Sequence, residues 1–359
     1  METVCSPIPN AGETLLLRGL LLPGPEAEAA ARQWLEQTGI EGLNEGLLRL
    51  LPLLRHRLDP ALVPERARPG LARVVRHYWL ANTRWQYQAG QILAGLPAPV
   101  VALKGLALAH SVYPTSLCRP CNDLDLLVAP EAFEAVRDHL LGFGYTADGE
   151  SLHAQLLTRP GWPEVDLHRS PYHEACSAAL VRPILERVVP LSVHDVAIQR
   201  LGDADQLLHT LAHGLRPNRV SPLRWVVDAD RQLTAAGSAL DWSVFLAESS
   251  RLGLSEVAAR SLAVLEDLVP GRVPVPILQA LEQQRSPASA RSFRLEREIE
   301  GPLNLWFRMR RNAPWPQRLL MLVQRYRQRW RSEGSRDMLG RGWYWGKRYL
   351  RGRFQSPKA

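Results

Sequence analysis

The 359-residue sequence is poor in cysteine, in lysine and in long apolar runs. Its four cysteines (Cys5, Cys118, Cys121 and Cys176) are too few and too scattered for a disulfide framework, so we expect the protein to reside in a reducing cytoplasm. The longest charge-free segment, residues 85–103, holds three glutamines and two prolines, which argues against a membrane span. The N-terminus has an acid, not a base, before its short apolar run and does not resemble a signal peptide.

Acidic residues are scarce at one end of the chain only. Residues 301–359 contain fifteen lysines or arginines and two acids, whereas the first 300 residues contain 29 basic and 34 acidic side chains. The net charge of +8 is therefore the sum of a slightly acidic body and a strongly basic C-terminal segment.

Lysine is almost entirely replaced by arginine. Lys104 is the sole lysine in the first 346 residues, and only Lys347 and Lys358 follow it. A bias this strong usually reflects the genome, so a lysine that persists against it invites a specific explanation.

Apolar residues at three- and four-residue spacing predict helices up to about residue 95, where Pro97 and Pro99 interrupt the pattern. Strand, helix, strand, helix and a hairpin then form a compact α/β unit, and helices return from about residue 180. The predicted fold class is α/β (α+β), a small mixed-sheet core with helical segments on both sides. The predicted divisions are 1–95 (helical), 96–180 (α/β core), 181–290 (helical) and 291–359 (basic and aromatic-rich).

The stretch "RPCNDLDLLV" places two carboxylates, Asp123 and Asp125, on one face of a predicted strand, because a strand alternates its faces. Like charges so close repel each other, and a divalent cation such as Mg²⁺ or Mn²⁺ usually resolves the conflict. In "EVDLHRS", Asp166 lies between core residues and shares its face with Glu164 and His168. Three carboxylates on adjacent strands can hold metal ions for a phosphoryl or nucleotidyl transfer.

Upstream, "VALKGLALAHSVY" runs from strand to helix through Lys104 and Gly105. A glycine lets the backbone approach a ligand, a helix N-terminus offers N–H groups to phosphates, and a lysine adds a mobile charge. A lone D-x-D pair is more often a solvated edge or a loop-end acid pair. The ordered set of glycine turn, D-x-D strand and later strand acid favours the metal site.

These motifs resemble the bacterial "uncharacterised nucleotidyltransferase" family of the DNA polymerase beta-type nucleotidyltransferase superfamily. The family hallmark of L-K-G, R-x-x-x-D-x-D-L-L-V and D-L-H is matched at residues 103–105, 119–128 and 166–168, and a downstream histidine and W-x-x-D at His213 and 225–228. The resemblance covers about 95 to 235.

The resemblance implies that Asp123, Asp125 and Asp166 bind the metal, with Asp166 positioning or deprotonating the attacking hydroxyl. It implies that Lys104 and Gly105 contact the phosphates of the nucleotide, with His168 beside them. The superfamily usually has Gly-Ser or Gly-Gly at this turn, whereas Leu106 follows Gly105 here. Arg119 could contact phosphates or pair with an aspartate.

Two further pairs are assigned to structure rather than chemistry. Cys118 and Cys121 form C-R-P-C without a second ligand pair for zinc, so we expect ordinary loop thiols, with a redox switch as the alternative. His209 and His213 lie on one helix face but lack the glutamate of a zinc protease motif. We expect them to pack or hydrogen-bond, although His213 could border the cleft.

The C-terminal segment alternates aromatic and basic residues between residues 308 and 353. Three interpretations remain open: a helix docked on the body, a peripheral anchor on an anionic membrane at the inner membrane face, or a nucleic-acid-binding tail.

The predicted function is Mg²⁺- or Mn²⁺-dependent transfer of a nucleoside monophosphate from a nucleoside triphosphate (NTP), such as ATP, to a hydroxyl of an unknown acceptor. The family's gene neighbourhoods suggest exopolysaccharide or modified-peptide synthesis. The alternatives are a non-catalytic nucleotide-binding adaptor, and an RNA-modifying nucleotidyltransferase that uses the basic tail.

Overall fold

The structure is a computed structural model in which the chain divides into two units, Met1–Ala290 and Arg291–Ala359. It describes residues 5–151, 153–172, 177–216, 220–287, 289–290 and 293. The predicted contact region at 308–353 and Cys176 lie outside the described residues. Within the described residues, no helix is long and apolar enough to cross a membrane.

The first part of the chain is helical, as its periodicity predicts. Asn10 and Glu13 form a capping box that starts the first helix, and Pro69 lies in the first turn of the long helix α5. The elements are α1 (Ala11–Leu21), α2 (Gly24–Gln37), η1 (Ile40–Gly42), α3 (Glu45–Leu48), α4 (Leu51–Arg57), η2 (Pro60–Leu62), η3 (Glu65–Ala67) and α5 (Arg68–Ala94).

A seven-stranded mixed sheet follows, with the order β3-β4-β5-β2-β1-β7-β6. The β2–β5 and β1–β7 pairs are parallel, and the other pairs are antiparallel. The strands are β1 (Val101–Ala102), β2 (Asp123–Leu127), β3 (Thr146–Glu150), β4 (Ala154–Thr158), β5 (Glu164–His168), β6 (Val189–Val193) and β7 (Val196–Arg200). Between them lie α6 (Lys104–Ser111), η4 (Ser116–Cys118), η5 (Pro130–Ala132), α7 (Phe133–Gly142) and α8 (Ala178–Leu185).

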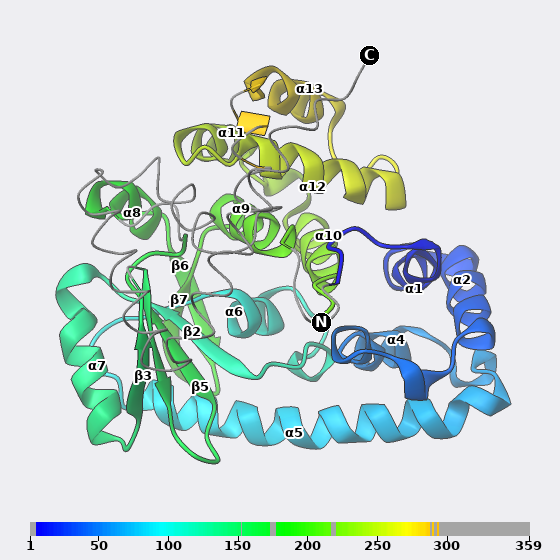
Figure 1. The fold of residues 1–359 in the computed structure, drawn as a ribbon, viewed down its shortest axis with the longest axis horizontal. Coiled ribbons are helices and arrows are strands. Elements are labelled where there is room, and N and C mark those ends of the chain that lie inside the picture. The colour runs from blue at the N-terminus through cyan, green and yellow to red at the C-terminus, as the bar shows by residue number, and fades with distance from the viewer. Residues whose placement is uncertain are drawn as a thin grey trace, which may run out of the picture. The chain divides into compact units, whose positions relative to one another are not determined.

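The core of this α/β unit packs α5 and α7 against the apolar face of the central strands (Figure 1). Alternate residues of β2 and β5 point into that core, so the remaining residues share the opposite face. The buried apolar residues are Leu124, Leu126, Val165 and Leu167 from the two strands, Trp85, Ala89, Ile92 and Leu93 from α5, and Phe133, Val136 and Leu140 from α7. Burial of the apolar residues therefore determines which residues of β2 and β5 lie on the polar face.

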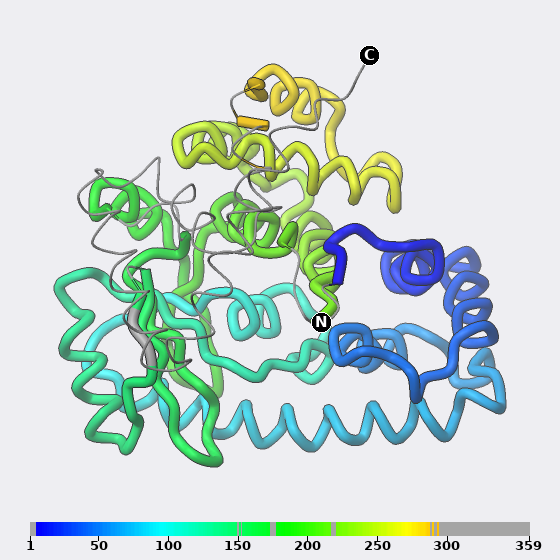
Figure 2. The backbone as a smooth tube through the Cα atoms, in the orientation of Figure 1, coloured from blue at the N-terminus to red at the C-terminus, as the bar shows by residue number. Residues whose placement is uncertain are grey.

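Helices dominate again after the sheet, as predicted. Figure 2 traces the chain from α5 through the sheet to these later helices. They are α9 (Asp203–Gly214), α10 (Arg224–Ala236), η6 (Gly237–Ala239), α11 (Trp242–Arg251), α12 (Ser255–Leu268) and α13 (Val275–Gln284). Helices α9 and α10 pack closely, because Gly214 leaves room for the side chain of Trp225.

The sequence analysis missed the β6–β7 hairpin and expected helices from about residue 180. The hairpin turns at His194 and Asp195, which have φ values of +49° and +63°. Such a turn is usually recognised by glycine or asparagine, and Pro190 in β6 also weakens the strand pattern. Because β7 pairs with β1, the sheet extends past residue 180. The finer division into residues 1–95, 96–180 and 181–290 stays a prediction.

We expect Gly214→Ala to destabilise the protein by about 1–3 kcal/mol through overpacking. An added Cβ would lie 2.2 Å from side-chain atoms of Trp225. Urea unfolding measures the change. Gly39→Ala is the matched control, because a Cβ there meets nothing within 4 Å and φ is −79°. Equal stability of the two variants would contradict the close α9–α10 approach.

Candidate active site

The register of the parallel strands β2 and β5 decides which polar side chains meet. Asp125 is paired with Asp166, and Leu127 is paired with His168. Because the apolar residues of both strands point into the core, Asp125, Asp166 and His168 share the outer face. The structure therefore brings the predicted third carboxylate next to the D-x-D pair.

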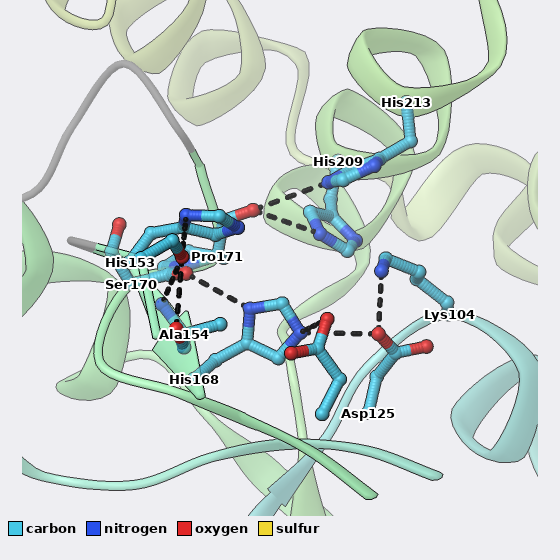
Figure 3. Close-up of polar contacts among 11 residues, drawn as sticks. Lys104, Asp125, His153, Ala154, His168, Ser170, Pro171, His209 and His213 are labelled. Atoms are coloured by element: carbon cyan, nitrogen blue, oxygen red, sulfur yellow. Dashed lines mark hydrogen bonds and ion pairs between the residues drawn. The ribbon is translucent and has the colours of Figure 1, made fainter. Parts of the chain in front are cut away.

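His168 bridges two of the carboxylates (Figure 3). Its Nε2 lies 3.1 Å from Oδ1 of Asp125 and 3.1 Å from Oδ2 of Asp166. Its Nδ1 lies 3.3 Å from the carbonyl oxygen of Ser170, which can only accept a hydrogen bond. Asp125 and His168 are almost completely buried, whereas the side chain of Asp166 is 30% exposed. Asp166 is thus the member of this cluster that an external molecule can reach most easily.

The two carboxylates favour the charged form of His168. Burial by itself lowers the pKa of His168, but the hydrogen bonds to Asp125 and Asp166 outweigh it, and the pKa is raised. A protonated imidazole donates from both nitrogens, as the contacts with the carboxylates and Ser170 require. Nε2 can become a metal ligand only after losing this proton.

Lys104 supplies a second cation to the same carboxylate. Its Nζ lies 2.5 Å from Oδ1 of Asp125 (Figure 3). Burial opposes the charge on Lys104, but attraction to Asp125 outweighs it and raises the pKa of Lys104. The backbone of Lys104 has φ +43°, a conformation that costs a non-glycine residue roughly 1–2 kcal/mol. A strained residue at the first position of α6 is what a functional constraint predicts.

The pKa values of Asp123 and Asp125 are shifted in opposite directions, because Lys104 and His168 contact Asp125. Burial raises the pKa of Asp125, but Lys104 and His168 outweigh it and hold that pKa well below its usual range. Repulsion from Asp125, followed by burial, raises the pKa of Asp123. The repulsion that the D-x-D pattern predicts is therefore present, and it raises the pKa of Asp123.

The donor set fits a divalent cation. One ligand atom each of Asp125, Asp166 and His168 lies within 4.8 Å of the others. Two carboxylate oxygens and an imidazole nitrogen suit Mn²⁺ and, with added water, Mg²⁺. Asp123, which the sequence also predicts as a metal ligand, is not part of this group among the described residues, and its role as a ligand stays a prediction. Asp123 lines the adjoining cavity together with Asp125.

Gly105 is required by packing at the turn into α6. A Cβ at this position would lie 2.9 Å from Nη1 of Arg119 and 3.0 Å from Sγ of Cys121. The side chain of the next residue, Leu106, is buried in the apolar core, so it cannot replace the serine that the superfamily often has at this position. A side-chain hydroxyl contact to a triphosphate would have to come from elsewhere.

Arg119 adopts the second of its two predicted roles and pairs with an aspartate. Its Nε and Nη2 donate to Asp228 at 2.8 and 2.7 Å, and the hydroxyl of Tyr113 donates to the same carboxylate at 2.7 Å. Burial raises the pKa of Asp228, but Arg119 outweighs it, so that pKa is lowered. This buried bidentate pair joins the loop before β2 to α10.

His209 and His213 face the cluster from α9 (Figure 3). Their Nε2 atoms lie 3.1 and 3.3 Å from the carbonyl oxygen of Pro171, to which each can donate. Burial, together with Lys104, lowers the pKa of His209 to about 3, so its ring is neutral. The expected packing and hydrogen-bonding role thus describes His209, and His213 also lines the cavity.

A cavity of about 330 Å³ adjoins the cluster. Lys104, Gly105, Asp123 and Asp125 line one part of it. Sequence reasoning missed several other lining residues because they come from distant segments. They are Gly46 and Arg49 from the N-terminal helices, Thr210 on α9, and Ser221 and Arg224 at the start of α10.

Cys118 and Cys121 are buried free thiols beside this cavity. Burial raises the pKa of both, which keeps them in the unreactive thiol form. This is the ordinary structural role expected for them, and Cys121 packs against Arg119.

The mixed sheet carries carboxylates on two adjacent parallel strands, and a strand–helix turn at Lys104 and Gly105 lies beside them. This is the arrangement of a nucleotidyltransferase core. The chain belongs to the family of uncharacterised nucleotidyltransferases, whose sequence model matches residues 47–270. This match extends beyond the 95–235 region that carries the motifs and includes Arg49. No curated protein and no solved structure matches the chain.

We expect Lys104→Gly to be more stable than Lys104→Ala by roughly 1 kcal/mol, because glycine adopts φ +43° without strain. Both variants lose the ion pair with Asp125, so their difference isolates the backbone. Chemical denaturation measures it. An alanine variant as stable as the glycine variant would show that the backbone at this position is unstrained.

We expect Asp228→Asn to destabilise the protein by about 3–5 kcal/mol, because it leaves Arg119 buried without its counter-charge. The lowered pKa of Asp228 means that its contribution is present at neutral pH and is lost as the pH falls through the folded-state pKa. Unfolding at several pH values measures both effects. Asp138→Asn, at an exposed ion pair on α7, should change stability little.

Proposed function

We propose that the protein transfers a nucleoside monophosphate from an NTP to a hydroxyl group of an acceptor, with Mg²⁺ or Mn²⁺ as cofactor. The observation that carries this proposal is the convergence of Asp125, Asp166 and His168 on one sheet face, beside a cavity lined by Lys104 and Asp123. Membership of a nucleotidyltransferase family supports it. Asp125 and Asp166 would hold the cation, with Asp123 or His168 completing the set.

In the proposed reaction, the acceptor oxygen forms a bond to the α-phosphorus, and the bond from that phosphorus to the bridging oxygen of pyrophosphate breaks. When bound, the cation would neutralise charge on the phosphate oxygens in this step. Asp166, the least buried carboxylate of the cluster, would take the proton of the hydroxyl. Asp125 stays ionised because Lys104 and His168 hold its pKa low.

Lys104 would change partners in the donor complex. Its ammonium forms an ion pair with Asp125, and its side chain also lines the cavity. A bound cation would compete for Oδ1 of Asp125, which would free the flexible side chain of Lys104 to contact a phosphate. This explains why a lysine, which carries a compact and mobile charge, is kept in an arginine-rich chain.

We expect Asp125→Asn and Asp166→Asn to lose Mn²⁺ binding, and to lower turnover by roughly 100-fold or more. Calorimetry with Mn²⁺, and with each of ATP, CTP, GTP and UTP plus Mg²⁺, measures binding and identifies the donor. Pyrophosphate release with candidate acceptors measures turnover. The Asp138→Asn control, which removes an exposed carboxylate on α7, should behave as wild type.

Normal turnover in the Asp125 or Asp166 variant would show that these carboxylates have no role in the reaction. Nucleotide binding without pyrophosphate release for any acceptor would favour the non-catalytic adaptor.

A further inference from the structure

The cavity beside the carboxylate cluster has a second polar region, to which the proposed function has so far assigned no role. It is formed by Arg49, Ser221 and Arg224, which have no role in the reaction steps described above but could hold a substrate, and is called here the arginine–serine end. Arg49 directly follows α3, Ser221 precedes α10, and Arg224 is the first residue of α10. Two backbone segments far apart in the sequence therefore bring hydrogen-bond donors to one place.

Arg224 is a partly buried cation with spare donors. Its Nη1 donates to the carbonyl oxygen of Pro120 at 2.7 Å, and within the described residues Arg224 forms no ion pair. The neighbouring Arg119 is already neutralised by its bidentate pair with Asp228. Burial, followed by repulsion from Arg119, lowers the pKa of Arg224, as expected for a cation without its own counter-charge.

Ser221 adds an unsatisfied hydroxyl. The residue is 5% exposed and lines the cavity, and among the residues that the structure describes its Oγ has no hydrogen-bond partner. A buried polar atom without a partner costs free energy, so such an atom in a cavity wall favours binding of a hydrogen-bonding group there. The position is held firmly, because a Cβ on Gly46 would lie 2.2 Å from the carbonyl oxygen of Ser221.

Arg49 also retains donor capacity. Its guanidinium pairs with Glu45, whose side chain is half exposed, but its Nε is buried and has no partner within the described part of the chain. The N-terminus of α10 contributes a partial positive charge. Leu223, which precedes the helix, provides no side-chain cap for the N–H groups there. All of these features favour an oxyanion.

We propose that the arginine–serine end binds a phosphate group of a substrate. The identification of the oxyanion as phosphate rests on the proposed function, because the cavity also holds Asp123, Asp125 and Lys104. The phosphate could belong to the polyphosphate chain of the donor or to a phosphorylated acceptor. In the first case, this end supplies the contacts that the core residue Leu106 cannot make.

Calorimetry of the full-length protein with inorganic tripolyphosphate, in EDTA and at physiological salt, tests the proposal without a metal. We expect Arg224→Gln to weaken binding by about 10- to 100-fold, as loss of a charge-assisted hydrogen bond does. Ser221→Ala removes a single oxygen and should weaken binding by about three- to tenfold. This second variant keeps the test decisive if Arg224→Gln fails to fold.

Arg32→Gln is the matched control, because it removes one exposed arginine on α2 and changes the net charge equally. Tripolyphosphate affinity that is the same in Arg224→Gln, Ser221→Ala and Arg32→Gln would overturn the proposal. That result would mean that the ion binds to other basic residues.

Competition with the NTP identified as the donor distinguishes the two sources of phosphate. Displacement of tripolyphosphate by the NTP assigns the site to the donor, and simultaneous binding assigns it to the acceptor; both support the proposal. Specific tripolyphosphate binding without any turnover would contradict the proposed function and leave the subsite intact. Turnover with unchanged affinity in both variants would contradict the subsite alone.

Discussion

The parallel pairing of β2 with β5 is the constraint on which the site depends. It places Asp125 beside Asp166, and burial of the alternate residues fixes both carboxylates on the outer face. Two neighbouring negative charges in a partly dry environment repel each other. The protein offsets this repulsion with Lys104 and His168, which both contact Oδ1 of Asp125. The site is thus held together by cations that a metal ion would have to displace or join.

The surrounding helices are joined to the sheet by a second buried charge pair. Arg119 precedes β2 and Asp228 lies in α10, so their bidentate contact connects segments 109 residues apart. Gly105 permits this connection, since a side chain there would meet Arg119. The glycine of the L-K-G motif therefore has a packing role at the same place where a phosphate-binding role was expected.

Local patterns in the sequence predicted much of the fold and part of the site. Alternation in "DLDLLV" and "EVDLHRS" identified the two strands and the face that Asp166 and His168 share. The β6–β7 hairpin was missed, because its turn at His194 and Asp195 lacks the glycine that normally marks such φ values.

Non-local contacts explain the other omissions. The pairing of Arg119 with Asp228 remained one of two alternatives, since nothing in the local sequence distinguishes a phosphate ligand from a distant carboxylate. The contribution of Arg49 and Ser221 to the cavity was not visible either. It depends on the close contact of Gly46 with Ser221, which is 175 positions further along the chain.

Because Lys104 is the sole lysine in the first 346 residues, it can be followed by chemical labelling. Acylating reagents need an uncharged amine, and the ion pair with Asp125 raises the pKa of Lys104 and keeps it charged. The other lysines, Lys347 and Lys358, lie near the end of the sequence, so a proteolytic peptide map separates them from Lys104 without ambiguity. Acylation of Lys104 would therefore report, from a single peptide, whether Asp125 still holds its ammonium partner.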